Sequence, residues 1–332
     1  MSVPRSMREN LSRKIGVEVS EIAFLVTSRT GTYATALTAR GVSQGSIYTS
    51  HQTAYDSLTE GQNDVLAVYP GTHDVNLTSH GEDGFLVSKD NTHIVAMYPE
   101  TIYNGQTRFA SQGTTGTNVT MSIQCKESIF MGFNVTNSHS AAGVTAVQLG
   151  DGATVAALNN QFKWVGMAGI HGSSALSSAT ASSLQLYGAA SCMFENCQIG
   201  DTISKKTASS GQLRFTAVTN GVGNQNNEFR KCRFHSWSNT SGSYLVLHDG
   251  ANASDRVNLF DDCMFFNFDN GAGKPAAVLH FPAGTPTGYH IVLHNCHQTG
   301  STAWLSATSV ATNVSISMHA AEATGGTTSA PT

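Results

Sequence analysis

The chain has 332 residues and a formal net charge of −4, from 18 basic and 22 acidic residues. Only 12% of its residues are charged, against about 25% in an average soluble protein. The acidic balance argues against a protein built to bind nucleic acid. No apolar run reaches the about 18 residues that a membrane span needs, so we expect neither a nucleic-acid nor a membrane partner.

The first residues and the cysteines bear on where the protein folds. Residues 1–5 lead into a polar stretch and lack the apolar segment of a secretory signal. The six cysteines include no Cys-x-x-Cys pair, which a structural zinc site commonly uses. We therefore expect free thiols in a protein that folds in a cytoplasm, where disulfides are rare.

Residues 5–16 have the pattern of a short amphipathic helix that Gly16 ends. Ser6 is placed to cap it with Glu9 three residues later, and its apolar face carries Met7, Leu11 and Ile15. A docking arm for an acidic partner surface and an ordinary solvated helix face explain its basic residues equally well. These residues are Arg5, Arg8, Arg13 and Lys14.

Residues 1–50 do not match the repeat that follows, so we predict an N-terminal attachment and capping region there. A second helix is expected over residues 50–61, capped by Ser50 or Thr53 and ended by Gly61. Its apolar positions are Ala54, Tyr55 and Leu58. We expect this helix to cover the end of the domain that follows.

From residue 65 the sequence repeats one unit, an apolar residue followed three positions later by a second one. The starting positions are separated by 29, 36, 32, 32, 35, 31 and 33 residues, by subtraction. A period near 30 with variable loops is typical of a solenoid. The starting residues are Val65, Ile94, Phe130, Phe162, Phe194, Phe229, Phe260 and Leu293.

The unit favours strands over helices, because short runs of Phe, Val and Ile lie among Gly, Ser, Thr and Asn. Two apolar residues three apart cannot share one face of a straight strand, so we predict a tight corner between them. Asn196, Asp262 and Asn295 occupy this corner, and Asn and Asp tolerate left-handed backbone. A further apolar strand precedes each later corner, as at residues 184–186 and 213–215.

These features predict an all-β chain, a single-stranded right-handed parallel β-helix over residues 51–318 with short N-terminal helices and a C-terminal closing segment. A β-sandwich is the alternative. Residues 319–332 form a low-complexity tail. The interior columns that we predict contain Phe130, Phe162, Phe194, Phe229, Phe260 and Leu293, and Cys197, Cys232, Cys263 and Cys296.

A helix followed by a strand that ends in Pro70-Gly71-Thr72 resembles the entry to pectate-lyase-like β-helices. That group includes bacteriophage tailspikes and related virion proteins. The resemblance implies a homotrimer. In family members that cleave polysaccharides, it implies either acidic residues with calcium or a pair of carboxylates.

Four acidic residues near the corners are the candidates for such a pair. Glu195, Glu228, Asp261 and Asp262 are in neighbouring repeats, but Arg230 falls between Glu195 and Asp261 in the predicted stack. We therefore favour local ion pairs over catalysis and expect no enzyme, cofactor or metal. A zinc site at His280, His290, His294 and His297 is the weaker alternative, and Trp237 and Trp304 look isolated as sugar platforms.

The sequence thus predicts a bacteriophage structural protein, a capsid decoration (cement) protein that stabilises the particle as a homotrimer. Residues 1–50 would bind the major capsid protein or another virion protein, after assembly in the host cytoplasm. The alternatives are a tailspike-like polysaccharide depolymerase or lyase, or a receptor-binding protein of the phage tail with a surface glycan as its partner.

Overall fold

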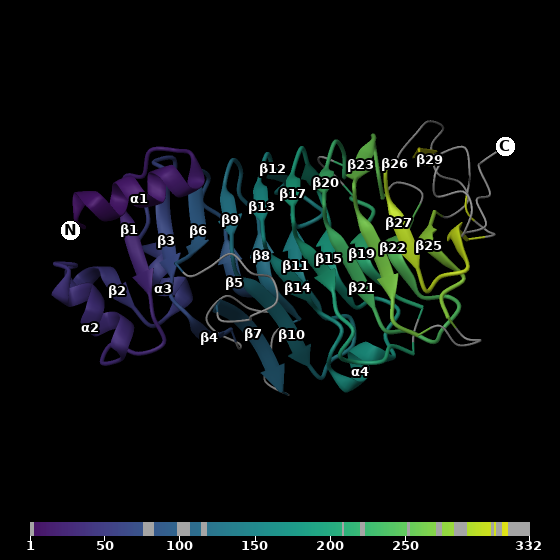
Figure 1. Ribbon diagram of the computed structural model, residues 1–332, viewed down its shortest axis with the longest axis horizontal. Coiled ribbons are helices and arrows are strands. Elements are labelled where there is room, and N and C mark those ends of the chain that lie inside the picture. Colours follow the sequence, from purple (N-terminus) through teal and green to yellow (C-terminus); the bar gives the residue numbers. More distant parts are fainter. Residues whose placement is uncertain are drawn as a thin grey trace.

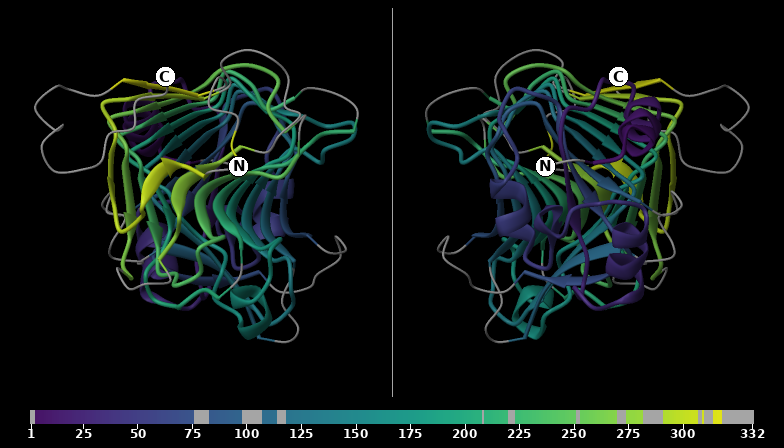
Figure 2. Two further views of the ribbon diagram at one scale, coloured as in Figure 1. Left: turned by 90° about the vertical axis from the view of Figure 1, so that its right-hand side faces the viewer. Right: turned by 90° about the vertical axis from the view of Figure 1, so that its left-hand side faces the viewer.

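The computed structural model of the chain describes residues 3–75, 83–97, 107–113, 118–207, 209–219, 223–250, 253–269, 274–281, 291–306, 309 and 314–317. It is a rod with the N-terminal helices at one end and the last strands at the other (Figure 1). Viewed along the rod, its sheets surround a common interior (Figure 2).

Three parallel sheets form the rod, and each gains one strand per circuit of the chain. In spatial order, the first sheet contains β2 (Ile47–Tyr48), β1 (Ile22–Leu25), β3 (Asp64–Val68), β6 (Thr92–Ala96), β9 (Ile129–Met131), β13 (Gln161–Lys163), β17 (Met193–Glu195), β20 (Glu228–Arg230), β23 (Asn258–Asp261), β26 (Ile291–His294) and β29 (Val314–Ser317).

The second and third sheets each have eight strands within the described residues. The second contains β4 (Gly71–Asp74), β7 (Thr107–Gly113), β10 (Asn134–His139), β14 (Gly166–Ala168), β18 (Gln198–Gly200), β21 (Arg233–Ser236), β24 (Met264–Asn267) and β27 (His297–Thr299). The third contains β5 (Asp83–Val87), β8 (Val119–Ile123), β11 (Thr145–Leu149), β15 (Ser182–Leu186), β19 (Gly211–Phe215), β22 (Tyr244–His248), β25 (Ala277–His280) and β28 (Ala303–Leu305). Two short strands, β12 (Ala157–Leu158) and β16 (Ala189–Ala190), pair with each other. In the sequence, each follows a strand of the third sheet and precedes a strand of the first.

The interior column of aromatic residues is confirmed. Phe130, Phe162, Phe194, Phe229 and Phe260 are paired in register along the first sheet, and Leu293 follows Phe260. Consecutive rings are stacked, with centroids 4.7, 4.6, 4.5 and 4.7 Å apart. This spacing is the strand separation of a sheet, so the parallel β-helix is confirmed and the β-sandwich is excluded.

The predicted corners are also present. Asn196, Asp262 and Asn295 have φ angles of 53°, 53° and 51°, the left-handed conformation that Asn and Asp tolerate best. Trp164 and Lys231 occupy the same corner in other circuits with φ of 52°. Left-handed residues also precede the strands, at Asn91, Glu127, Asn159, Ser191 and Asn226.

The lid helix is confirmed as α3 (His51–Asp56). Ser50 caps it by accepting a hydrogen bond from the backbone N–H of Thr53, but the helix ends at Asp56 and not at Gly61. Tyr55 is fully buried and packs edge-on against Phe85, with ring centroids 5.7 Å apart. The lid thus closes the N-terminal end of the interior core.

Residues 1–50, which we predicted to be an N-terminal attachment and capping region, contain strands that continue the first sheet. Strand β1 pairs with β3 and with β2. Two helices, α1 (Arg5–Ile15) and α2 (Thr32–Ala39), lie at the same end (Figure 1), and a 3₁₀ turn covers Gln44–Ser46. The fold therefore runs across the predicted boundary at residue 50.

The helices α1 and α2 pack on the outer face of β1, β3 and β6 and build a second core there, which we call the outer core. Its members include Leu11, Phe24, Leu37, Val65 and Val95. The first repeat therefore starts at Leu66, which pairs with Ile94 and faces the interior. Our assignment of Val65 to this position was wrong by one residue.

The C-terminal closing segment that we predicted contains β28 and β29, which pair with β25 and β26. The predicted tail, residues 319–332, lies outside the described residues. Among the helices of the described segments, none combines the length and apolar character needed to cross a membrane. A short helix, α4 (Ser173–Leu176), projects beside the second sheet (Figure 1).

Candidate functional sites

The basic residues of α1 differ in how free they are. Lys14 Nζ donates to the carbonyl of Ala96 at 3.0 Å, and Arg8 donates to the carbonyl of Ser20 at 3.4 Å. Arg5 pairs with Glu9 at 2.8 Å but its side chain is 88% exposed, and Arg13 is exposed. Of the predicted binding residues, Arg5 and Arg13 therefore face solvent most fully.

The start of α1 differs from our prediction. Pro4 is the N-cap residue, and no side chain caps the helix, so the expected Ser6 cap is wrong. Gly16 ends the helix in left-handed conformation, as predicted. An open cleft of about 720 Å³ lies between α1 and the chain that leaves it, lined by Arg5, Arg8, Glu9, Ser12, Arg13, Gly16, Val17, Glu18 and Val19.

Two of the four candidate acids, Glu195 and Asp261, lie on the outer face of the first sheet in a column of alternating charge, whereas Glu228 is two residues before Arg230 and Asp262 is at the corner after β23. The register places Lys163, Glu195, Arg230, Asp261 and His294 side by side in successive strands. We call this column the charge ladder.

Each acid has a partner near the charge ladder. Glu195 lies 3.9 Å from Lys163 Nζ, Glu228 pairs with Arg230 at 2.6 Å, and Asp261 lies 2.7 Å from His294 Nδ1. Asp262 accepts a hydrogen bond from Asn295 at 3.3 Å. Paired hydrolytic carboxylates need a shared open space about 5–9.5 Å across. Here a guanidinium lies between Glu195 and Asp261, so the arrangement is the local ion pairing that we favoured.

The proposed histidine zinc site does not assemble in the described part of the chain. His280 Nδ1 lies 2.8 Å from Ser306 Oγ, whereas His294 is in the charge ladder. His290 lies outside the described residues. Over the segments that the structure describes, no group of three or more His, Cys, Asp or Glu side chains could hold a metal ion.

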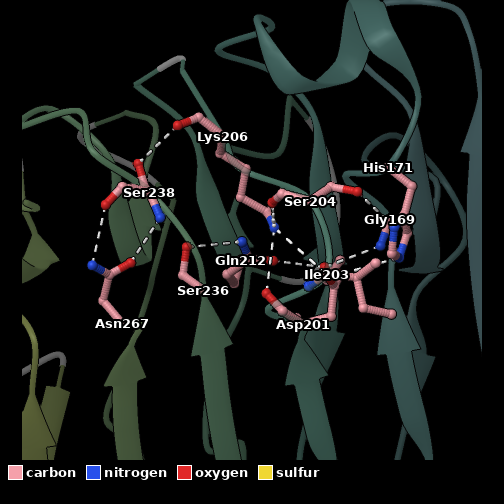
Figure 3. A network of polar contacts seen from close by, with 12 residues as sticks. Gly169, His171, Asp201, Ile203, Ser204, Lys206, Gln212, Ser236, Ser238 and Asn267 are labelled. Carbon is pink, nitrogen blue, oxygen red and sulfur yellow. Dashed lines mark hydrogen bonds and ion pairs between the residues drawn. The ribbon is translucent and has the colours of Figure 1, made fainter. Parts of the chain in front are cut away.

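A buried polar cluster that we did not predict lies beside the second sheet (Figure 3). Asp201 Oδ2 lies 3.0 Å from His171 Nε2, and Asp201 Oδ1 lies 3.9 Å from Lys206 Nζ. The Lys206 side chain is fully buried. It also donates to the carbonyl of Ser204 at 3.0 Å.

The electrostatics of this cluster follow from its burial. Burial alone would raise the pKa of Asp201, but the neighbouring His171 and Lys206 lower this pKa to about 2. Burial lowers the pKa of Lys206, and the Asp201 carboxylate opposes that shift. Ser204 Oγ is 3.5 Å from His171 Nδ1. Because the carboxylate also neutralises a buried ammonium, its primary role is to stabilise the loop that carries Lys206.

The cluster forms one wall of a groove of about 350 Å³ on the outer face of the second sheet. Small residues form part of its floor, including Gly166, Ala168 and Gly200. Polar and charged side chains surround that floor, namely Arg108, Asn134, Thr136, Ser138, His171, Gln198 and Asp201. Such a surface offers both hydrogen-bond donors and acceptors to a bound molecule.

Aromatic side chains extend the same outer face, further along the second sheet. Trp237 contacts Phe268 edge-on with ring centroids 5.8 Å apart, and Phe266 lies beside Phe268. Phe268 is 60% exposed and Met264 is 47% exposed. We had expected Trp237 to be isolated, and its contact with Phe268 shows that this expectation was wrong. We call Trp237, Met264, Phe266 and Phe268 the aromatic patch.

Comparisons with known proteins identify only the fold. No protein-family model and no curated protein matches the sequence. Among solved structures, the chain resembles ORF18 of Geobacillus virus E2, with 13% identity, a TM-score of 0.50, and coverage of 74% of this chain and 44% of that one. The chain thus spans less than half the length of this viral protein.

A second likeness is to a pectin methylesterase mutant in complex with a hexasaccharide, with 12% identity, a TM-score of 0.51, and coverage of 86% of this chain and 81% of that one. A pectate lyase is also similar, with 12% identity and a TM-score of 0.49. At these identities the likeness concerns the backbone alone. The chain has a right-handed parallel β-helix fold, which it shares with this pectin methylesterase.

Proposed function

We propose that the protein is a structural component of a bacteriophage virion, a capsid decoration protein that attaches by its helical end and forms a homotrimer. The observation that carries this proposal is the pairing of the four candidate acids in and beside the charge ladder, which favours a structural role over catalysis. Within the described residues, the outer face of the first sheet thus presents a surface on which each of these four carboxylates has a partner.

The attachment surface is the solvent side of α1. Its apolar side is fixed, because Leu11 and Ile15 are buried in the outer core, so Arg5 and Arg13 are held on a firm base. The basic residues of α1 outnumber its one acid, Glu9, which pairs with Arg5, and a surface of net positive charge suits a partner surface of the opposite sign. An acidic capsid surface is therefore the partner, and the virion is the location.

The attachment experiment compares two charge reversals that change net charge equally. Arg5→Glu with Arg13→Glu alters the attachment surface, whereas Lys126→Glu with Lys231→Glu alters exposed residues elsewhere on the rod. We expect the first pair to reduce retention on undecorated particles about tenfold, which corresponds to about 1.4 kcal/mol. Co-sedimentation measures retention, and equal retention of both variants would refute attachment through α1.

Two further measurements test the rest of the proposal. A homotrimer has three times the chain mass of 35.0 kDa in light scattering, and a monomeric mass at the working concentration would refute the trimer. Incubation with host capsular polysaccharide should release neither reducing ends nor unsaturated sugars, and release of either would identify an enzyme.

A second candidate function rests on the groove and the aromatic patch of the second sheet. Aromatic faces next to hydrogen-bonding side chains suit the apolar and hydroxyl faces of a sugar ring. The protein would then be a receptor-binding protein that recognises a host glycan without cleaving it. Calorimetry with host polysaccharide should detect binding, Phe268→Ala should weaken it, and unchanged binding by that variant would exclude the patch.

A further inference from the structure

Four cysteines form a continuous column inside the rod, next to the phenylalanine stack. The residues that follow them, Gln198, Arg233, Met264 and His297, are paired in register along the second sheet. Cys197, Cys232, Cys263 and Cys296 therefore occupy one position in four successive circuits. All four are free thiols with at most 2% of their surface exposed.

The sulfur atoms repeat with the spacing of the circuits, because every cysteine has the same contacts. Each Sγ lies near the carbonyl oxygen of the phenylalanine in the preceding circuit. The four distances are 3.5 Å for Cys197 to Phe162, 3.3 Å for Cys232 to Phe194, 3.2 Å for Cys263 to Phe229 and 3.4 Å for Cys296 to Phe260. The stacked rings of the neighbouring column measure the repeat directly, at 4.5–4.7 Å.

This spacing disfavours the two usual fates of neighbouring cysteines. A disulfide needs its Cβ atoms about 3.5–4.5 Å apart, with a mean near 3.8 Å, whereas strands in register are about 4.8 Å apart. Zinc requires ligands that converge tetrahedrally, and a straight column of parallel side chains does not converge.

The same spacing suits an ion that binds two ligands in a straight line. A metal–thiolate bond is about 2.3 Å long, so two such bonds end to end span about 4.6 Å. We propose that adjacent thiols of this column hold a soft, linearly two-coordinate ion between consecutive circuits, a site that is independent of the proposed function. Thiolate sulfur is the ligand type that selects soft ions such as Cu(I).

The charge balance decides which ion the interior accepts best. A divalent ion that displaces the protons of two thiols gives a neutral S–M–S unit, and both protons leave to solvent without any change of oxidation state. A monovalent ion between two thiolates would leave a buried negative charge, which is costly. The column therefore prefers Hg²⁺, or a monovalent ion bound to one thiolate and one intact thiol.

Proton release also makes the site pH-dependent. The thiolate, not the thiol, binds a metal ion, so each bound ion replaces thiol protons. Affinity for the ion consequently rises with pH.

Two double variants test the proposal because they remove the same number of thiols. Cys197→Val with Cys296→Val leaves Cys232 and Cys263 adjacent, whereas Cys232→Val with Cys263→Val leaves two thiols that are not neighbours. Valine already occupies this column at Val165, which precedes the residue paired with Gln198, so both variants should fold. Cys125 and Cys192 are free and buried in every variant and control for binding to single thiols.

The probe is Hg²⁺, followed by a wash with excess 2-mercaptoethanol and native mass spectrometry of the full chain. We expect the unchanged chain to retain two ions, the variant with adjacent thiols to retain one, and the variant with separated thiols to retain none. Equal retention by the two double variants would overturn the proposal, as would equal retention of Zn²⁺.

A second measurement avoids any dependence on the variants. X-ray absorption of the mercury-loaded chain should show two sulfur neighbours at about 2.3 Å. Three or four sulfur neighbours, or one sulfur with one light atom, would contradict a linear bridge. Thermal unfolding of both double variants confirms that they fold alike.

Discussion

The first sheet is one continuous structure with two different outer faces. At its N-terminal end, β3 and β6 are buried at every position, because the interior core lies on one side and α1 and α2 lie on the other. In the middle, β17 and β20 bury only their central phenylalanine, and their outer residues include Glu195 and Arg230. The same parallel pairing thus supports an N-terminal end that is covered by helices and a middle part, which we call the shaft, whose outer face is exposed.

The difference shows that the outward residues decide what covers each part of the sheet. Strand β3 reads Asp64-Val65-Leu66-Ala67-Val68, a nearly continuous apolar run of the kind that strands buried on both faces have. The middle strands alternate polar and apolar residues, which is typical of a sheet with one solvated face. The helical end is consequently a structural base, and the exposed shaft is available for contacts.

The largest effect is expected from removing an outward aromatic residue at the covered end. Phe24→Ala should cost about 3–5 kcal/mol, as much as Phe229→Ala in the interior, because both side chains are fully buried. Glu195→Ala, at an outer position of the shaft, should cost less than about 0.5 kcal/mol. Urea unfolding measures all three, and a small loss for Phe24→Ala would mean that the outer core is not a true core.

Asp201→Asn probes the exception on the shaft, a buried charge pair. It should cost about 3 kcal/mol, because it leaves the Lys206 ammonium buried without a compensating charge. Adding Lys206→Met should restore most of that loss. Unchanged stability of the single variant would show that Lys206 is neutral in the folded protein.

The same carboxylate gives a pH dependence. The pKa of Asp201 is lowered from 3.8 to about 2, so its stabilising effect is present above pH 3.8 and is lost as the pH falls towards about 2. Melting temperatures of the unchanged chain and the Asn variant should therefore converge in acid. A constant difference between them down to about pH 2 would contradict the assigned shift.

A corner substitution should have a smaller effect. Asn196→Ala should cost about 1 kcal/mol, because alanine tolerates the left-handed conformation poorly. Asn196→Gly should cost less than the alanine substitution, since glycine adopts this conformation freely. Thermal unfolding separates the two, and equal losses would assign the effect to lost hydrogen bonds.

The smallest effect is expected in the charge ladder. Arg230→Ala should leave the urea unfolding midpoint nearly unchanged, because its side chain is 50% exposed and water screens its ion pairs. The difference from the unchanged chain should shrink further in high salt. A loss of stability as large as that of Asp201→Asn would mean that the ladder determines the register of the strands.

The recurring parts of the fold could be predicted from the sequence. The phenylalanine and cysteine columns, the corners at Asn196 and Asn295, and the Ser50-capped lid all follow from a fixed spacing or a local capping rule. Such features repeat in every circuit or depend on a few neighbouring residues. One sequence therefore carries enough information to place them.

The features that occur once could not be placed in this way. The helix α1 packs on the outer face of β3. The sequence does not show which face of β3 is the outer one, because apolar residues occupy both faces and the usual alternation of polar and apolar residues is missing. The Asp201–Lys206 pair lies in the connection between β18 and β19, and the corresponding connections of other circuits do not repeat its sequence. The contact of Trp237 with Phe268 could have been predicted from the sequence, because each residue lies five positions after a column cysteine, Cys232 or Cys263.

Because every circuit returns to the same corner, a whole circuit is the natural unit by which this rod can change its length. Excising residues 197–231 would join Asn196 directly to Cys232, and the neighbours above and below would meet with matching side chains. The rod would lose one layer of about 4.8 Å. Evolution can thus adjust the reach of this molecule, by whole-layer gain or loss, without redesigning either end.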